Sequence, residues 1–156
     1  MKALVMEITS MQTALPSGVY VRYASSRVDV LKCLIVGPMG TPYENGLFEF
    51  DIICPANYPA SPPKVKFKTT GGGQAHFNPN LYRDGKVCLS LLGTWSGEPW
   101  RPNVSTMLQI FVSLQSMVLC EEPWCNEPGR EHHVGSEASF KYNHNIRHLT
   151  VEYALL

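Results

Sequence analysis

Cys88 lies in the part of this chain best suited to covalent chemistry. It follows the turn Arg83-Asp84-Gly85 and precedes an apolar run, and Asn80 lies upstream beside Pro79. A cysteine thiolate attacks carbonyl carbon, and the thioester that it forms stays reactive toward amines. An amide on a stiffened backbone can donate a hydrogen bond to the oxyanion that develops in such a reaction. Cys88 and Asn80 together therefore predict acyl transfer through a thioester.

Each of these residues also has an ordinary structural interpretation. Cys88 is followed by Leu-Ser-Leu-Leu, which is equally typical of a buried structural thiol. Asn-Pro-Asn is favourable turn chemistry, so Asn80 can be a plain turn residue, and Asn78 more readily ties the loop to itself. No histidine adjoins Cys88 in the sequence, so a thiol hydrolase would need one placed there by the fold. The residues alone leave these alternatives open.

Glu127 is a further candidate, in a loop that Pro123 and Pro128 bracket. Its carboxylate could orient an incoming lysine amine or accept its proton, although a solvated loop acid is the more frequent fate of a single glutamate. His144 and His148 lie one helical turn apart, as metal ligands can. No carboxylate or cysteine accompanies them convincingly, so we expect no metal site.

The composition predicts one globular domain over residues 1–156. The hydrophobic fraction is 44% and the charged fraction 17%, which are globular values. Thirteen basic residues balance thirteen acidic ones, which argues against nucleic-acid binding by bulk electrostatics. No apolar run is long enough to span a membrane. The five cysteines form no zinc-type doublets and suit reduced thiols in the cytoplasm or nucleus.

The periodicity of the chain predicts an α+β fold. A helix is expected over Lys2–Ala14, because Leu4, Ile8, Met11 and Leu15 recur at helical spacing before Pro16. Four strands with short, turn-rich links predict an antiparallel meander, and they cover Val19–Tyr23, Val30–Val36, Leu47–Ile53 and Lys64–Lys68. A long irregular segment follows over residues 70–103, and segments of that kind are usually functional.

Two C-terminal helices complete the prediction. One covers Ser105–Leu119, with Ser105 or Thr106 as its cap. The other carries an apolar stripe made of Tyr142, Ile146, Leu149, Tyr153 and Leu156. The flanking helices are the available cover for one face of the sheet.

Several motifs follow one another in order along nearly the whole chain. The motifs are Gly37-Pro38, Thr41-Pro42-Tyr43, Tyr58-Pro59, Pro62-Pro63-Lys64-Val65, Asn78-Pro79-Asn80, Gly85-Lys86-Val87-Cys88-Leu89 and Trp100 with Pro102. In this order they resemble the catalytic core domain of ubiquitin-conjugating enzymes. The resemblance implies that Cys88 takes ubiquitin, or a ubiquitin-like protein, from the activating enzyme as a thioester and passes it to a substrate lysine. It gives Asn80 an oxyanion or loop-supporting role, and it places Glu127 where many members position the acceptor lysine with an aspartate.

The resemblance also implies the partners and one alternative. Besides the modifier, the activating enzyme and protein substrates, a ligase or ligase regions of the same chain would take part. ATP would be used by the activating enzyme, so no cofactor is expected here. The alternative is a catalytically inactive module of the same fold that only presents ubiquitin, although such variants typically lack the cysteine.

Two departures point to a subgroup of the family. Asn78 stands where most members have histidine, and Ser90 stands where most have aspartate. Together with an enlarged loop over residues 93–99, these features resemble the large conjugating enzymes of the BRUCE or Apollon type. Conjugating and ligase functions can share one polypeptide there. Because members of that subgroup tend to be larger and this chain stops within an apolar helical stripe at Leu156, we expect it to be a piece of a larger protein.

Overall fold

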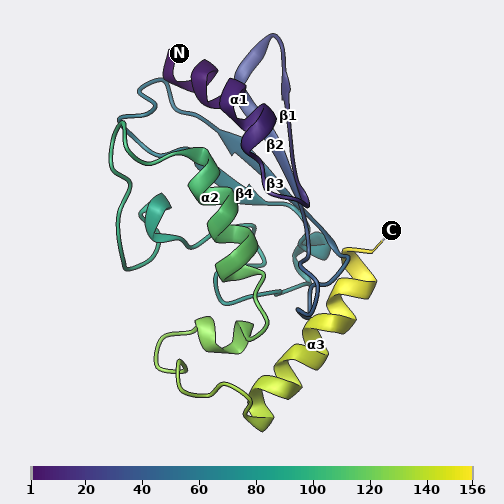
Figure 1. Ribbon diagram of the computed structural model, residues 1–156. Helices are drawn as coiled ribbons and strands as arrows, with labels where there is room; N and C mark the ends of the chain where they lie inside the picture. The colour runs from purple at the N-terminus through teal and green to yellow at the C-terminus, as the bar shows by residue number, and fades with distance from the viewer. Residues whose placement is uncertain (1, 156) are drawn as a thin grey trace.

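Four antiparallel strands form one sheet, and two helices pack against one of its faces (Figure 1). The computed structural model describes residues 2–155. The main elements are α1 (Lys2–Ala14), β1 (Val19–Ala24), β2 (Arg27–Val36), β3 (Leu47–Ile53), β4 (Lys64–Phe67), α2 (Met107–Ser113) and α3 (Glu137–Tyr153). The strands lie in the order β1-β2-β3-β4, so each pairs with its neighbour in sequence. The predicted α+β meander is confirmed.

Strand β3 shows how alternation in the sequence builds the core. Phe48, Phe50 and Ile52 point to the inner face and are fully buried. Asp51 points to the other face, where its carboxylate lies 2.8 Å from the Lys32 ammonium of β2. The sheet therefore has one apolar face and one charged face, as expected for an antiparallel sheet that is covered on one side.

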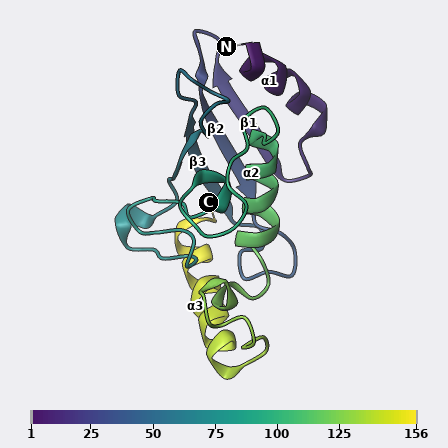
Figure 2. The same ribbon diagram turned by 90° about the vertical axis from the view of Figure 1, so that its left-hand side faces the viewer.

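Helices α1 and α2 cover the apolar face of the sheet. Leu4, Ile8 and Met11 form the buried stripe of α1, as predicted. Figure 2 shows α1 and α2 on the same side of the sheet, while α3 lies beyond one end of it. The Leu47 backbone amide, at the start of β3, donates to the Ala154 carbonyl over 2.8 Å, which fixes the C-terminal end of α3 against the sheet.

The predicted boundaries need several corrections, of which the smallest are that β1 extends to Ala24 rather than Tyr23 and that β4 ends at Phe67 rather than Lys68. Strand β2 begins at Arg27 rather than Val30, because Ala24 pairs with Arg27 across a two-residue turn. The helix predicted from Ser105 begins at Met107, where the Thr106 side chain caps it. Its last turn, η3 (Leu114–Val118), is π-helical rather than α-helical. The π turn shifts the side chains around the helix axis, and its frequent occurrence at functional sites draws attention to this position.

The last helix follows its predicted stripe over most of its length. Ile146 is fully buried, and Tyr142, Leu149 and Tyr153 pack partly buried against the core. Leu156, the last member of the predicted stripe, lies outside the described residues. Within residues 2–155, no helix combines the length and the apolar character needed to cross a membrane.

Candidate active site

Asn78 anchors the Asn-Pro-Asn turn to the protein interior. Its side chain is fully buried, and its amide nitrogen donates to the Tyr43 hydroxyl over 3.0 Å and to the Val118 carbonyl over 2.7 Å. Its amide oxygen accepts the backbone N–H of Asn80 over 2.8 Å. Because the amide joins the β2–β3 loop, the end of η3 and the turn itself, Asn78 fixes the position of Asn80.

Asn80 and Cys88 are joined by a reciprocal pair of hydrogen bonds. The Cys88 backbone N–H donates to the Asn80 carbonyl over 2.9 Å, and the Asn80 side-chain amide donates to the Cys88 carbonyl over 2.8 Å. The structure thus brings together the two residues that the sequence singled out. A primary amide carries two N–H groups, so one can hold the Cys88 carbonyl while the other serves a reacting group.

The turn between Asn80 and Cys88 requires glycine at its tip. Gly85 has φ +89°, and a Cβ at this position would lie 2.6 Å from the Phe67 carbonyl oxygen of β4. The Phe67 N–H in turn donates to the Gly85 carbonyl over 2.8 Å. The close approach of the turn to β4 therefore positions the strand-like segment that ends at Cys88.

Thr94 fixes the chain on both sides of Cys88. It was not among the residues predicted for the site. Its hydroxyl oxygen accepts the Leu89 N–H over 3.0 Å, and its O–H donates to the Val87 carbonyl over 2.8 Å. Between these contacts the chain forms a single 3-10 turn, η2 (Ser90–Leu92), which ends at Gly93 in the left-handed region. The enlarged loop is therefore folded back onto the candidate nucleophile.

A small cavity of about 250 Å³ lies on the side of that loop, and it is lined by Asn80 and by Leu89, the residue after Cys88, but not by Cys88 itself. Its walls include Asn80, Leu89, Trp95 and Asn126, and no histidine lines it within the described residues. Cys88 itself is only 2% exposed. The geometry gives no support to the thiol hydrolase considered from the sequence, because that chemistry needs an imidazole beside the thiol.

Glu127 lies on the other side of the Asn-Pro-Asn turn. It lines a separate groove of about 430 Å³ together with His76, Pro79, Tyr82, Arg83 and Asp84. The structure therefore places Glu127 next to the turn but not in the cavity beside Cys88. Burial lowers the pKa of His76, Arg83 lowers it further, and Glu127 opposes the shift. His76 lines the same groove as Glu127 and was not predicted from the sequence.

Asn126 holds the Glu127 loop against the site. Its amide nitrogen donates to the Met117 carbonyl over 3.0 Å and reaches the Asn78 amide oxygen at 3.5 Å. Asn126 was not among the residues predicted for the site. Its position explains how a loop far from Cys88 in sequence borders the same turn.

Two of the remaining thiols, Cys33 and Cys54, lie in the hydrophobic core. Burial raises the pKa of the Cys33 and Cys54 thiols to about 12, so these core cysteines carry little thiolate at neutral pH. Burial also raises the pKa of Cys120 and Cys125. Within residues 2–155, no group of three or more histidine, cysteine or acidic side chains is arranged to hold a metal ion.

Comparison with known proteins identifies the family of the chain. The family model described as ubiquitin-conjugating enzyme matches residues 3–150. A similar relative is the dual E2 ubiquitin-conjugating enzyme/E3 ubiquitin-protein ligase BIRC6 of Homo sapiens, which is 49% identical over 166 aligned residues covering 99% of this chain. The chain belongs to the ubiquitin-conjugating enzyme family, and the resemblance seen in its motifs is confirmed.

Two further relatives have different lengths. The probable ubiquitin-conjugating enzyme protein 17 of Caenorhabditis elegans is 50% identical over 99% of this chain. Ubiquitin-conjugating enzyme E2 Z of Xenopus tropicalis is 44% identical over 96% of it. The chain spans 3% of the human relative, 22% of the nematode relative and 47% of the frog relative. The predicted likeness to very large members of the family is therefore confirmed.

Proposed function

We propose that this domain accepts ubiquitin, or a ubiquitin-like protein, on Cys88 and transfers it to a substrate lysine. The observation that carries the proposal is the reciprocal hydrogen-bonded pairing of Asn80 and Cys88 beside a small cavity, in a chain of the ubiquitin-conjugating enzyme family. The proposal covers the region 1–156 as one conjugating domain of a longer protein.

The reaction would consist of two acyl transfers. In the first, the Cys88 sulfur bonds to the carbonyl carbon of the modifier's C-terminus, and the bond from that carbon to the activating enzyme's sulfur breaks. In the second, a lysine amine bonds to the same carbon, the Cys88 thiolate leaves, and the ammonium proton is lost. Each step passes through a tetrahedral oxyanion that hydrogen-bond donors stabilise.

The side chains of the site divide these tasks. We assign the second N–H of Asn80 to the oxyanion, while its first N–H holds the Cys88 carbonyl. Glu127, which is half-exposed in its groove, would orient the lysine ammonium or accept its proton. ATP would be used by the activating enzyme upstream, so we propose no bound cofactor for this domain.

The proposed partners are the modifier, an activating enzyme, protein substrates and a ligase, which can be a separate protein or a region of the same chain. One relative is itself named a dual E2 ubiquitin-conjugating enzyme/E3 ubiquitin-protein ligase, which favours ligase regions within the longer protein. All five cysteines are free thiols in the structure, which suits the reducing cytoplasm or nucleus. We propose no membrane or nucleic-acid partner.

A thioester assay tests the proposal. The protein is incubated with activating enzyme, ATP and ubiquitin and then separated on a gel without reductant. We expect a thiol-sensitive adduct of one ubiquitin that Cys88→Ala abolishes, and a reductant-resistant oxyester with Cys88→Ser. If no adduct forms with any activating enzyme while the protein is folded, the inactive ubiquitin-presenting module is the correct interpretation.

A further inference from the structure

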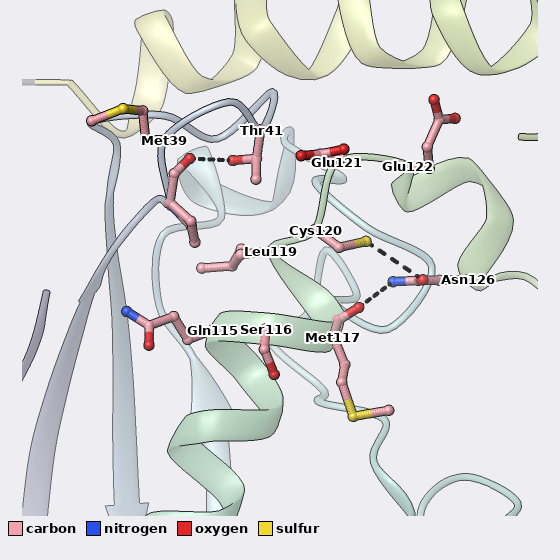
Figure 3. Close-up of a pocket in the computed structure, with 11 residues that line it drawn as sticks. Met39, Thr41, Gln115, Ser116, Met117, Leu119, Cys120, Glu121, Glu122 and Asn126 are labelled. Carbon is pink, nitrogen blue, oxygen red and sulfur yellow. Dashed lines mark hydrogen bonds between the residues drawn. The ribbon is translucent and has the colours of Figure 1, made fainter. Parts of the chain in front are cut away.

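A second and larger depression lies on the opposite side of the π turn from the Cys88 cavity. It has a volume of about 740 Å³, within the range of ligand-binding clefts, and it lies between the β2–β3 loop and the chain that follows η3. Figure 3 shows Met39 at one border and Met117 at the other, with Leu119 and Cys120 between them. The proposed reaction uses none of the residues at its centre.

Two exposed methionines give this groove an adaptable apolar rim. Met39 is 87% exposed and Met117 is 65% exposed. Both side chains are therefore available to pack against the apolar surface of a partner. The floor is formed by Leu119, which is fully buried, and by Thr41, which is nearly so. Flexible thioether side chains around an apolar floor are typical of surfaces that receive the apolar face of a helix.

The charge of the groove has one sign. Glu121 and Glu122 lie along its border near α3 in Figure 3, and no lysine or arginine lines it within the described residues. Glu121 is exposed, whereas Glu122 accepts the Ser139 hydroxyl. A chain with no net charge thus carries a locally acidic, apolar-rimmed groove.

We propose that this groove, lined by Met39, Met117, Leu119, Glu121 and Glu122, docks a basic amphipathic helix of a partner protein. The apolar stripe of the helix would pack between the two methionines, and its lysine or arginine side chains would face Glu121 and Glu122. An acidic helix would be repelled by the same groups. The groove and the Cys88 cavity share Met117 and Asn126 as a common wall, so the docked partner would be held beside the site without entering it.

Binding of a defined peptide tests this proposal directly. The probe is a fluorescein-labelled helix of Ala, Leu and Lys, about 14 residues or four turns long, with leucine on one stripe. A matched peptide has Glu in place of each Lys. Fluorescence anisotropy should rise saturably with the Lys peptide, fall back at high salt, and show no binding of the Glu peptide.

Matched variants locate the binding. Glu121→Lys and Met39→Ser should each weaken binding of the Lys peptide by about tenfold. Glu152→Lys makes the same charge change on an exposed position of α3, and Met6→Ser removes an exposed methionine of α1; both should bind as the wild type does. The two groove variants should keep the Tm of the wild type, which shows that they are folded without relying on the chemistry at Cys88 and separates this test from that of the proposed function.

Three results would overturn the docking proposal. They are failure of the Lys peptide to bind at millimolar concentration, equal binding of the Glu peptide, and equal weakening by the control variants. Each is independent of whether Cys88 accepts ubiquitin, because the peptide assay needs neither activating enzyme nor ATP.

Discussion

Asn80→Ala is the substitution that best separates chemistry from loop support. It removes the donor that the Cys88 carbonyl accepts at 2.8 Å, and the carbonyl belongs to a residue that is only 2% exposed. A buried acceptor left without a partner costs about 1–3 kcal/mol in the free energy of unfolding. For a domain of this size, Tm should fall by roughly 2–4 °C for each kcal/mol.

Asn80→Ala should slow the reaction by more than its loss of folding stability can explain. Removing one oxyanion donor typically costs about 10²–10³ in rate. In discharge to lysine, this domain's own residues would stabilise the oxyanion, whereas in loading the activating enzyme also takes part. We therefore expect Asn80→Ala to slow discharge by about 10² and to slow loading much less. The assay is single-turnover discharge of the preformed thioester to free lysine, with loading by the activating enzyme followed in parallel.

Thr94→Val is the matched control for this prediction. It removes a hydroxyl that also braces the chain around Cys88, through Leu89 and Val87, so its effect on Tm should be similar, but it leaves the Asn80 amide in place. We expect Thr94→Val to slow discharge far less than Asn80→Ala does. Equal losses in loading and discharge for Asn80→Ala, or equal discharge rates for both variants, would refute an oxyanion role and leave Asn80 as a structural residue.

Three further predictions follow from the site. Gly85→Ala should lower the free energy of unfolding by about 1–3 kcal/mol, measured by urea denaturation, because its Cβ would lie 2.6 Å from a β4 carbonyl. Asn78→His should cost about 1–3 kcal/mol in the same assay, since a neutral imidazole has one N–H for the two acceptors that Asn78 serves; unchanged stability would contradict this. His76 has a folded-state pKa below its ordinary 6.5, so the unfolded state binds its proton first, and stability should fall as pH drops below about 6.5. His76→Gln should reduce that pH dependence of Tm, and an identical profile would exclude the contribution.

The strands and the core helices were predictable because their information is local. The alternation of Phe48, Phe50 and Ile52 with acidic residues has one solution, a strand covered on one side, and the structure buries all three. The stripe of α1 is equally simple. The start of β2 was missed although Arg27-Val28-Asp29-Val30 alternates polar and apolar residues. The hairpin pairing of Ala24 with Arg27 shows that the strand begins there.

The candidate site was only partly predictable, because its supports come from distant parts of the chain. Cys88 and Asn80 could be paired from one motif. The role of Thr94 depends on a loop folding back onto the chain it left. Asn126 contacts Asn78 across 48 positions of sequence. The spacing of residues within a single helix or strand does not encode such contacts. From the sequence, the Thr94 hydroxyl and the Asn126 amide therefore look the same as polar side chains that only contact solvent.

The π turn links these unpredicted contacts to one another. At the end of η3 the Leu119 N–H donates to the carbonyl of Leu114 rather than to that of Gln115. The helix therefore ends with the Met117 and Val118 carbonyls directed to side-chain donors. Asn126 binds the first and Asn78 binds the second. Asn78 is therefore a helix cap as well as a turn residue, because its amide N–H donates to the Val118 carbonyl while its amide oxygen accepts the Asn80 N–H. The Asn-Pro-Asn turn, the Glu127 loop and the end of the helix form one hydrogen-bonded unit, and a change at any of them should be felt at Asn80.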